Sequence, residues 1–127
     1  MSRRAVAVVR DLFFVARIRE TGRLVETDVV FARDSGEIAP ALAAAPADLV
    51  IVDLTTPGAD YEALFSALER APRSPVLGYT THVLARQTQP WHRRCDRVVT
   101  KEMLTRDLAA ILREGITGHS AATEVRP

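Results

Sequence analysis

The sequence of 127 residues has little cysteine and no long apolar runs. Its single cysteine, Cys95, excludes an internal disulfide, and with three scattered histidines it matches no structural zinc spacing. Apolar runs such as Leu49–Val52 fall far short of the roughly 20 residues that cross a bilayer, and the N-terminus lacks the apolar segment of a signal peptide. We therefore expect a soluble cytoplasmic protein that does not bind a membrane and is stabilised by packing.

The sequence also has no large excess of charge of either sign. Seventeen basic residues against sixteen acidic ones give a net charge of +1, so no strong field attracts nucleic acid. The 47% hydrophobic content suits one packed domain, which we expect at 1–115. The small polar residues of 116–127 predict a flexible tail or the start of a linker. Sixteen of the basic residues are arginine, so Lys101 is the only lysine.

Short apolar stretches alternate with helical patterns along the chain. Such alternation is typical of βα units that build a parallel sheet, and near-continuous apolar strands indicate a sheet covered on both faces. The sequence therefore predicts an α/β fold. The five predicted strands are Ala5–Val9, Val29–Ala32, Leu49–Val52, Val76–Tyr79 and Arg97–Val99.

The helical segments carry recognisable start and stop signals. Asp60 is placed to cap a helix whose apolar stripe runs from Tyr61 to Leu68. Gly115 is placed to end the last helix, and Gly22 is placed to end the first. The other predicted helices are Leu12–Thr21, Ser35–Ala45, a short helix at His82–Gln87, and the stripe Leu104–Leu112. Pro40 is expected either to lie in the first turn of its helix or to distort that helix, and Gln89–Trp91 is expected to interrupt the short helix.

Polar side chains follow four of the predicted strands. In an open parallel sheet the carboxyl ends of the strands form the edge where ligands bind. These side chains combine a carboxylate, a second acid, a hydroxyl and an ammonium, which is what phosphorylation of an aspartate requires. The residues are Arg10 and Asp11, Asp53, Thr80 and Thr81, and Thr100, Lys101 and Glu102.

Three blocks of the sequence resemble the response-regulator receiver family, over roughly residues 5 to 114. The block from Asp48 to Asp60, DLVIVDLTTPGAD, is similar to the segment around the receiver phosphoacceptor. The block PVLGYTT, which ends at Thr81, resembles the fourth receiver strand with its hydroxyl, and DRVVTK, which ends at Lys101, resembles the fifth strand with its lysine.

The resemblance implies a five-stranded, doubly wound, flavodoxin-like sheet in the order 2-1-3-4-5. It implies that Asp53 accepts a phosphoryl group while Thr80 and Lys101 bind its oxygens, and that Asp11, Asp53 and Thr55 hold Mg²⁺. Such a protein is not an enzyme beyond its own phosphorylation and dephosphorylation. The implied partners are a histidine kinase or phosphotransfer protein, and a downstream protein or second copy bound through the face of the fourth helix, fifth strand and last helix.

Three positions depart from the receiver pattern. A pair of acids usually follows the first strand, and this sequence has Arg10 and Asp11 there, so one acid of the pair is missing. This predicts weak or lost Mg²⁺ binding unless Arg10 turns outward; alternatively Arg10 contacts Asp53 and neutralises its charge itself. Glu102 stands where a proline usually follows the lysine, and Val98 replaces the aromatic residue of the fifth strand. Thr81 has a local reading as the cap of the helix near His82.

These departures leave alternative functions open. One is a pseudo-receiver that is not phosphorylated and is controlled by partner binding. Another is a small nucleotide- or flavin-binding enzyme, which the lack of a glycine-rich loop after the first strand disfavours. Trp91, followed by Arg93 and Arg94, either forms a docking patch or packs against the sheet. Cys95 is expected to be a small buried residue.

Overall fold

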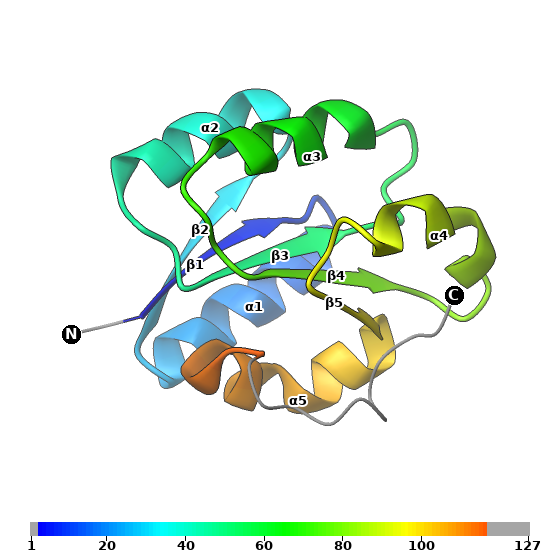
Figure 1. The fold of residues 1–127 in the computed structure, drawn as a ribbon. Coiled ribbons are helices and arrows are strands. Elements are labelled where there is room, and N and C mark those ends of the chain that lie inside the picture. The colour runs from blue at the N-terminus through cyan, green and yellow to red at the C-terminus, as the bar shows by residue number, and fades with distance from the viewer. Residues whose placement is uncertain (1–2, 117–127) are drawn as a thin grey trace.

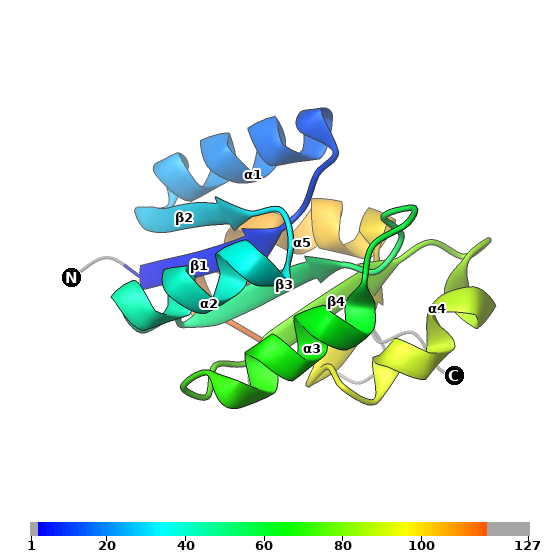
Figure 2. The same cartoon turned by 90° about the horizontal axis from the view of Figure 1, so that it is seen from above.

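The protein, described here by a computed structural model over residues 3–116, consists of one sheet between two layers of helices. Figures 1 and 2 show the sheet edge-on and from above. All neighbouring strands pair in parallel. The strands are β1 (Arg3–Val8), β2 (Thr27–Ala32), β3 (Leu49–Asp53), β4 (Val76–Thr80) and β5 (Arg97–Thr100).

The strand order is β2-β1-β3-β4-β5, which confirms the predicted doubly wound fold. Every residue of β3, β4 and β5 is buried, as expected for strands covered on both faces. The β3–β4 register places Asp53 opposite Tyr79, and the β4–β5 register places Thr80 opposite Thr100. The polar strand ends therefore lie at one edge.

Five helices cover the two faces of the sheet. The first and last helices lie on one face, and the other three lie on the opposite face (Figure 1). Helix α3 begins at its predicted cap, because the Asp60 carboxylate accepts a hydrogen bond from the Ala63 amide at 3.0 Å. The helices are α1 (Leu12–Leu24), α2 (Ser35–Ala44), α3 (Tyr61–Arg70), α4 (Ala85–His92) and α5 (Lys101–Glu114).

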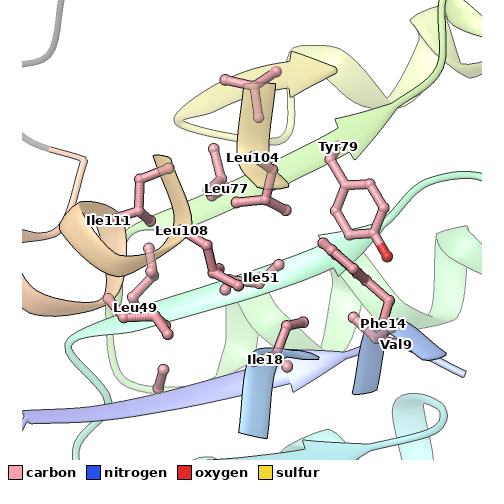
Figure 3. Packing of buried hydrophobic residues seen from close by; sticks show 14 residues of the cluster. Val9, Phe14, Ile18, Leu49, Ile51, Leu77, Tyr79, Leu104, Leu108 and Ile111 are labelled. Carbon is pink, nitrogen blue, oxygen red and sulfur yellow. The ribbon is translucent and has the colours of Figure 1, made fainter. Parts of the chain in front are cut away.

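The sheet divides the apolar core into two halves. Leu49 and Ile51 of β3 pack toward α1 and α5, whereas Val50 and Val52 pack toward α2 and α3. This alternation follows from the two-residue period of a strand. Figure 3 shows the first half of the core, in which the Tyr79 ring lies beside Phe14 of α1.

The prediction that Gly22 ends the first helix is wrong. Helix α1 continues to Leu24, and Gly22 is buried within it. A Cβ atom built on Gly22 would lie 2.8 Å from Val29 Cγ2 and 2.9 Å from the Thr27 carbonyl oxygen. This position needs a residue without a Cβ atom, because the helix backbone lies directly against β2.

We expect Gly22→Ala to lower the free energy of unfolding by roughly 1 to 3 kcal/mol, because the added methyl group forces α1 away from β2. Urea unfolding followed by circular dichroism measures the loss. Gly36→Ala is the matched control: its Cβ would approach only the Asp34 carboxylate, at 3.3 Å, so little change is expected. Equal stability of Gly22→Ala and the natural protein would contradict this account.

Two prolines lie inside helices rather than at their ends. Pro40 belongs to the body of α2, not to its first turn, and Pro90 belongs to α4 instead of interrupting it. Both residues are exposed, so the carbonyl groups that lose a helical partner near them can reach water. The predicted helix at His82–Gln87 is therefore replaced by one at Ala85–His92.

The last helix ends as predicted. Gly115 adopts a φ of 82° and its amide donates to the Ile111 carbonyl at 2.7 Å. Ile116 packs against the core, while the rest of the predicted tail lies outside the described residues and stays a prediction. No helix within residues 3–116 combines the length and apolar character needed to cross a membrane.

Candidate functional site

Asp53 ends β3 at the carboxyl edge of the sheet and is buried, with 8% of its surface exposed. Its Oδ1 atom accepts hydrogen bonds from the Thr55 amide at 2.8 Å and the Thr55 hydroxyl at 2.6 Å. The Tyr61 hydroxyl donates to the Asp53 carbonyl at 2.7 Å and accepts from the Thr56 amide at 2.9 Å. Side chain and loop are thus held, and within the described chain Oδ2 accepts no well-aligned hydrogen bond.

Asp11 connects β1, α1 and the lysine. Its Oδ1 atom caps α1 by accepting from the amides of Phe13 at 3.0 Å and Phe14 at 3.2 Å. Its Oδ2 atom accepts from the Lys101 ammonium at 3.1 Å. The Lys101 hydrogen bond, followed by the Phe14 amide, holds the pKa of Asp11 below its usual value. Lys101 also lies 5.1 Å from the centre of the Phe14 ring, so its position is fixed from two sides.

Arg10 lies on the other side of Asp53. The two residues line a cavity of about 150 Å³ between the ends of β1 and β2, the start of α2 and the β3–α3 loop. Arg33 lines the same cavity but forms an ion pair with Glu37 at 3.1 Å. Arg10 is exposed and forms no ion pair with Asp53 within residues 3–116. The direct contact considered from the sequence is therefore not made.

The Thr80 hydroxyl is directed toward α4. It hydrogen bonds with the Thr88 hydroxyl at 3.0 Å, and that hydroxyl lies 2.9 Å from His92 Nε2. Thr88 also contacts the Ala85 carbonyl at 3.2 Å. All three side chains, Thr80, Thr88 and His92, are buried. A continuous chain of polar contacts therefore joins the predicted phosphoryl-binding hydroxyl to helix α4.

The surroundings of His92 determine its protonation. Its Nδ1 atom is buried and has no hydrogen-bond partner, so a proton on that nitrogen would be an unsatisfied donor in the interior. The favoured form is a neutral ring with the proton on Nε2, directed at Thr88. Burial also lowers the pKa of His92.

We expect the free energy of unfolding to fall as the pH drops through about 6.5, because the unfolded His92 takes up a proton there and the folded one only at lower pH. The contribution of neutral His92 is complete above the pKa of the unfolded state and is lost as the pH falls from there to the lower pKa of the folded state. His92→Gln should flatten the curve, as measured by urea unfolding at a series of pH values. His82→Gln, at an exposed position, should leave the slope unchanged; a slope equally steep in His92→Gln would contradict the assignment.

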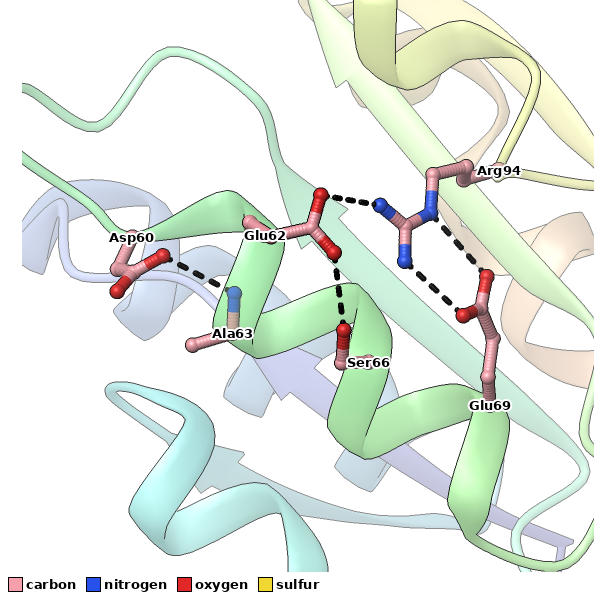
Figure 4. Close-up of polar contacts among 6 residues, drawn as sticks. All are labelled: Asp60, Glu62, Ala63, Ser66, Glu69 and Arg94. Atoms are coloured by element: carbon pink, nitrogen blue, oxygen red, sulfur yellow. Dashed lines mark hydrogen bonds and ion pairs between the residues drawn. The ribbon is translucent and has the colours of Figure 1, made fainter.

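Trp91 is not an exposed anchor, because it is partly buried and packs against the half of the core formed by the sheet, α2 and α3. Its ring stacks on Phe65 of α3 with centroids 5.9 Å apart and planes 9° apart. Arg94 forms ion pairs with Glu62 and Glu69 of α3, each at 2.9 Å (Figure 4). These contacts attach α4 and the turn after it to α3. The expectation that Trp91 and Arg94 belong to a free docking face is therefore wrong.

The remaining predicted residues have local roles. Thr81 accepts a hydrogen bond from the Leu84 amide at 3.2 Å in the turn before α4. The sequence predicts that Thr81 caps a helix starting near His82, but α4 begins only at Ala85. Glu102 lies in the first turn of α5, where a negative charge favours the helix. Cys95 is partly buried and packs with the α3-side core.

The pocket fits a divalent cation poorly. Both oxygens of Asp11 already accept hydrogen bonds, one of them from an ammonium. Asp53 Oδ1 is held by Thr55, and Arg10 adds a positive charge to the same edge. Hard cations require several free oxygen ligands and an excess of negative charge, and residues 3–116 contain no group of three potential side-chain ligands.

Comparisons with known proteins were informative at the level of structure alone. No protein-family model and no curated protein sequence matches the chain. A response regulator from Hahella chejuensis superposes with a TM-score of 0.74 at 20% identity, covering 94% of this chain and 99% of that one. The chain has the receiver fold.

Two further receiver structures extend the comparison. The receiver domain of the sensor histidine kinase PA1611 from Pseudomonas aeruginosa PAO1, which has a magnesium ion in its active-site cleft, has a TM-score of 0.73 at 14% identity and covers 89% of this chain and 96% of that one. The chemotaxis response regulator CheY4 of Vibrio cholerae has a TM-score of 0.68 at 18% identity, with 91% and 100% covered. The receiver fold is therefore common to proteins of very different sequence.

Sequence reasoning missed three polar residues at this edge of the sheet. Tyr79 was taken only as the end of an apolar strand, although its register opposite Asp53 places it at the site. The sequence does not single out Thr88, and His92 stands out only as part of the run from Trp91 to Arg94. The spacing of four residues between Thr88 and His92, which puts them on one helix face, was the available signal.

Proposed function

We propose that this receiver accepts a phosphoryl group on Asp53 from a phosphohistidine of a histidine kinase or phosphotransfer protein, and signals through protein contacts. The observation that carries the proposal is the state of the Asp53 carboxylate. It is buried at the carboxyl edge, with Oδ1 held by Thr55 and Oδ2 left without a well-aligned partner. A fixed carboxylate with one available oxygen is suited to act as a nucleophile.

The transfer balances as a simple displacement. Asp53 Oδ2 attacks the phosphorus, an O–P bond forms, the N–P bond of the phosphohistidine breaks, and the imidazole leaves with the bonding electrons and takes a proton from water. The product is an acyl phosphate. Thr80, which ends β4, and Lys101, which begins α5 directly after β5, are the proposed ligands of its oxygens. Binding requires Lys101 to share or leave its contact with Asp11 and the Thr80 hydroxyl to turn back from Thr88.

We infer that this receiver holds Mg²⁺ only weakly. The oxygens of Asp11 and Asp53 that would bind the ion are engaged by hydrogen bonds, and Arg10 replaces an acid at the cavity beside Asp53. In this proposal, the positive charges of Arg10, at the cavity beside Asp53, and of Lys101, paired with Asp11, offset the charge of an incoming phosphoryl group.

Asp53→Asn should abolish phosphorylation, because an amide oxygen does not displace the histidine leaving group. Incubation with a phosphohistidine donor or a small acyl phosphate, followed by mass spectrometry, measures the product. Asp60→Asn is the control, since Asp60 lines the same cavity but caps α3, and it should remain phosphorylated. Modification of the Asp53→Asn protein, or none in the natural protein, would overturn the proposal.

Arg10→Asp should raise Mg²⁺ affinity by an order of magnitude or more, about 1.4 kcal/mol per tenfold, because it adds a ligand and removes a repulsive charge. Titration calorimetry with Mg²⁺ measures the change. Arg33→Asp makes the same charge change in the same cavity but adds no carboxylate next to Asp11 after β1, so its Mg²⁺ affinity should rise much less. Tight binding by the natural protein, or an equal gain in both variants, would show that Arg10 does not replace the missing acid.

A second candidate function is an unphosphorylated pseudo-receiver. The Lys101–Asp11 pair favours it, because the lysine already has an acidic partner, and so does Arg10. The phosphorylation experiment on Asp53 separates the two functions. The third alternative, a flavin- or nucleotide-binding enzyme, is disfavoured because the cavity beside Asp53, about 150 Å³, is smaller than ordinary cofactor pockets.

The partner surface remains a proposal on the face of α4, β5 and α5. Trp91 and Arg94 do not contribute to it, since they face α3. The candidate contacts on this face are Val83, which is 85% exposed in the β4–α4 turn, and the exposed Arg93 and Glu102. A downstream protein or a second copy of the chain would bind there when α4 responds to the state of Asp53.

A further inference from the structure

Tyr79 carries a buried hydroxyl group at the carboxyl edge of the sheet. The residue is 1% exposed, and its hydroxyl oxygen is buried without a hydrogen-bond partner. It lies directly opposite Asp53 in the β3–β4 register. Because side chains at paired positions of neighbouring strands point to the same face, the phenol and the Asp53 carboxylate are neighbours at the sheet edge.

The phenol is fixed in this position. Its ring meets Phe14 edge to face, with centroids 5.2 Å apart and planes at 67° (Figure 3). The ring is packed among Val9, Leu104 and other members of the core between the sheet, α1 and α5. The hydroxyl therefore has little freedom to turn toward another acceptor. On the neighbouring Asp53 carboxylate, Oδ1 already accepts two hydrogen bonds from Thr55.

The hydroxyl remains a proton donor at any physiological pH. Burial, followed by the negative charge of Asp53 and the contact of the hydroxyl with that carboxylate, raises the pKa of Tyr79. A buried donor without an acceptor destabilises the state in which it occurs, and a new acceptor placed beside it is correspondingly favoured.

We propose that the Tyr79 hydroxyl donates a hydrogen bond to an oxygen of the phosphoryl group on Asp53, so that Tyr79 is a phosphoryl-binding residue of this receiver. The inference rests on the proposed function. Phosphorylation places three acceptor oxygens on the carboxylate beside the hydroxyl, and the phenol itself does not have to change its position or its protonation to meet one of them. The donor that lacks a partner in the unmodified protein then gains one, which favours the phosphorylated state.

The two tyrosines of the chain offer a matched test. The Tyr61 hydroxyl already bonds to the Asp53 carbonyl and the Thr56 amide, whereas the Tyr79 hydroxyl bonds to neither side chain nor backbone within the described residues. Tyr61→Phe should therefore lower the urea midpoint of the unmodified protein. Tyr79→Phe should leave that midpoint unchanged or raise it, since the ring packing is kept and an unsatisfied group is removed.

Beryllofluoride, used with Mg²⁺ as a stable substitute for the phosphoryl group, supplies the second measurement. Tyr79→Phe should bind it about tenfold more weakly than the natural protein, the loss expected for one hydrogen bond to a charged group. The acyl phosphate should also hydrolyse faster in this variant. Fluorine NMR measures beryllofluoride binding and mass spectrometry the lifetime. Together these results, weaker binding with undiminished stability, support the proposal.

Opposite results would overturn it in distinguishable ways. Equal beryllofluoride affinity of Tyr79→Phe and the natural protein, with phosphorylation of Asp53 intact, would refute the role of Tyr79 and leave the proposed function standing. A fall in urea midpoint like that of Tyr61→Phe would show that the hydroxyl is structural. A natural protein that takes up neither beryllofluoride nor a phosphoryl group would overturn the proposed function and this inference with it.

Discussion

The parallel register of the sheet decides which polar side chains can meet at its carboxyl edge. Asp53 and Tyr79 share one face because they are paired across β3 and β4, and the Asp11–Lys101 pair, with Phe14 beneath it, lies on the same side. A step of one residue along a strand reverses the face. Thr80 is therefore directed to α4.

This division gives the site two halves with different physical character. The half beside α1 and α5 contains a buried phenol, a carboxylate and an ammonium, so charge there is neutralised by pairing. The half beside α2, α3 and α4 contains Arg10 at a cavity and a chain of neutral groups from Thr80 to His92. The neutral chain joins the Thr80 hydroxyl to α4.

The sequence predicted the strands, their order through the family resemblance, and the helix signals at Asp60 and Gly115, because these depend on local pattern. It also placed Asp11, Asp53, Thr80 and Lys101 at strand ends. What it could not predict depends on distances between segments. From the sequence, Gly22 indicates the end of a helix; only the contact with β2 shows that a glycine is needed inside it. Likewise, only the packing of α4 against α3 shows that Phe65 is the partner of Trp91.

The only side-chain amine of the sequence lies at the candidate site. Lys101 keeps 39% of its side chain exposed while its ammonium contacts Asp11, so reagents can reach it although its environment is specific. Reductive methylation with a carbon-13 label would therefore add a single lysine methyl resonance to the NMR spectrum. That resonance would come from the carboxyl edge of the sheet itself, free of the overlap that many surface lysines cause in other proteins. Because all other basic residues are arginine, a reagent that modifies side-chain amines reports on the candidate site alone.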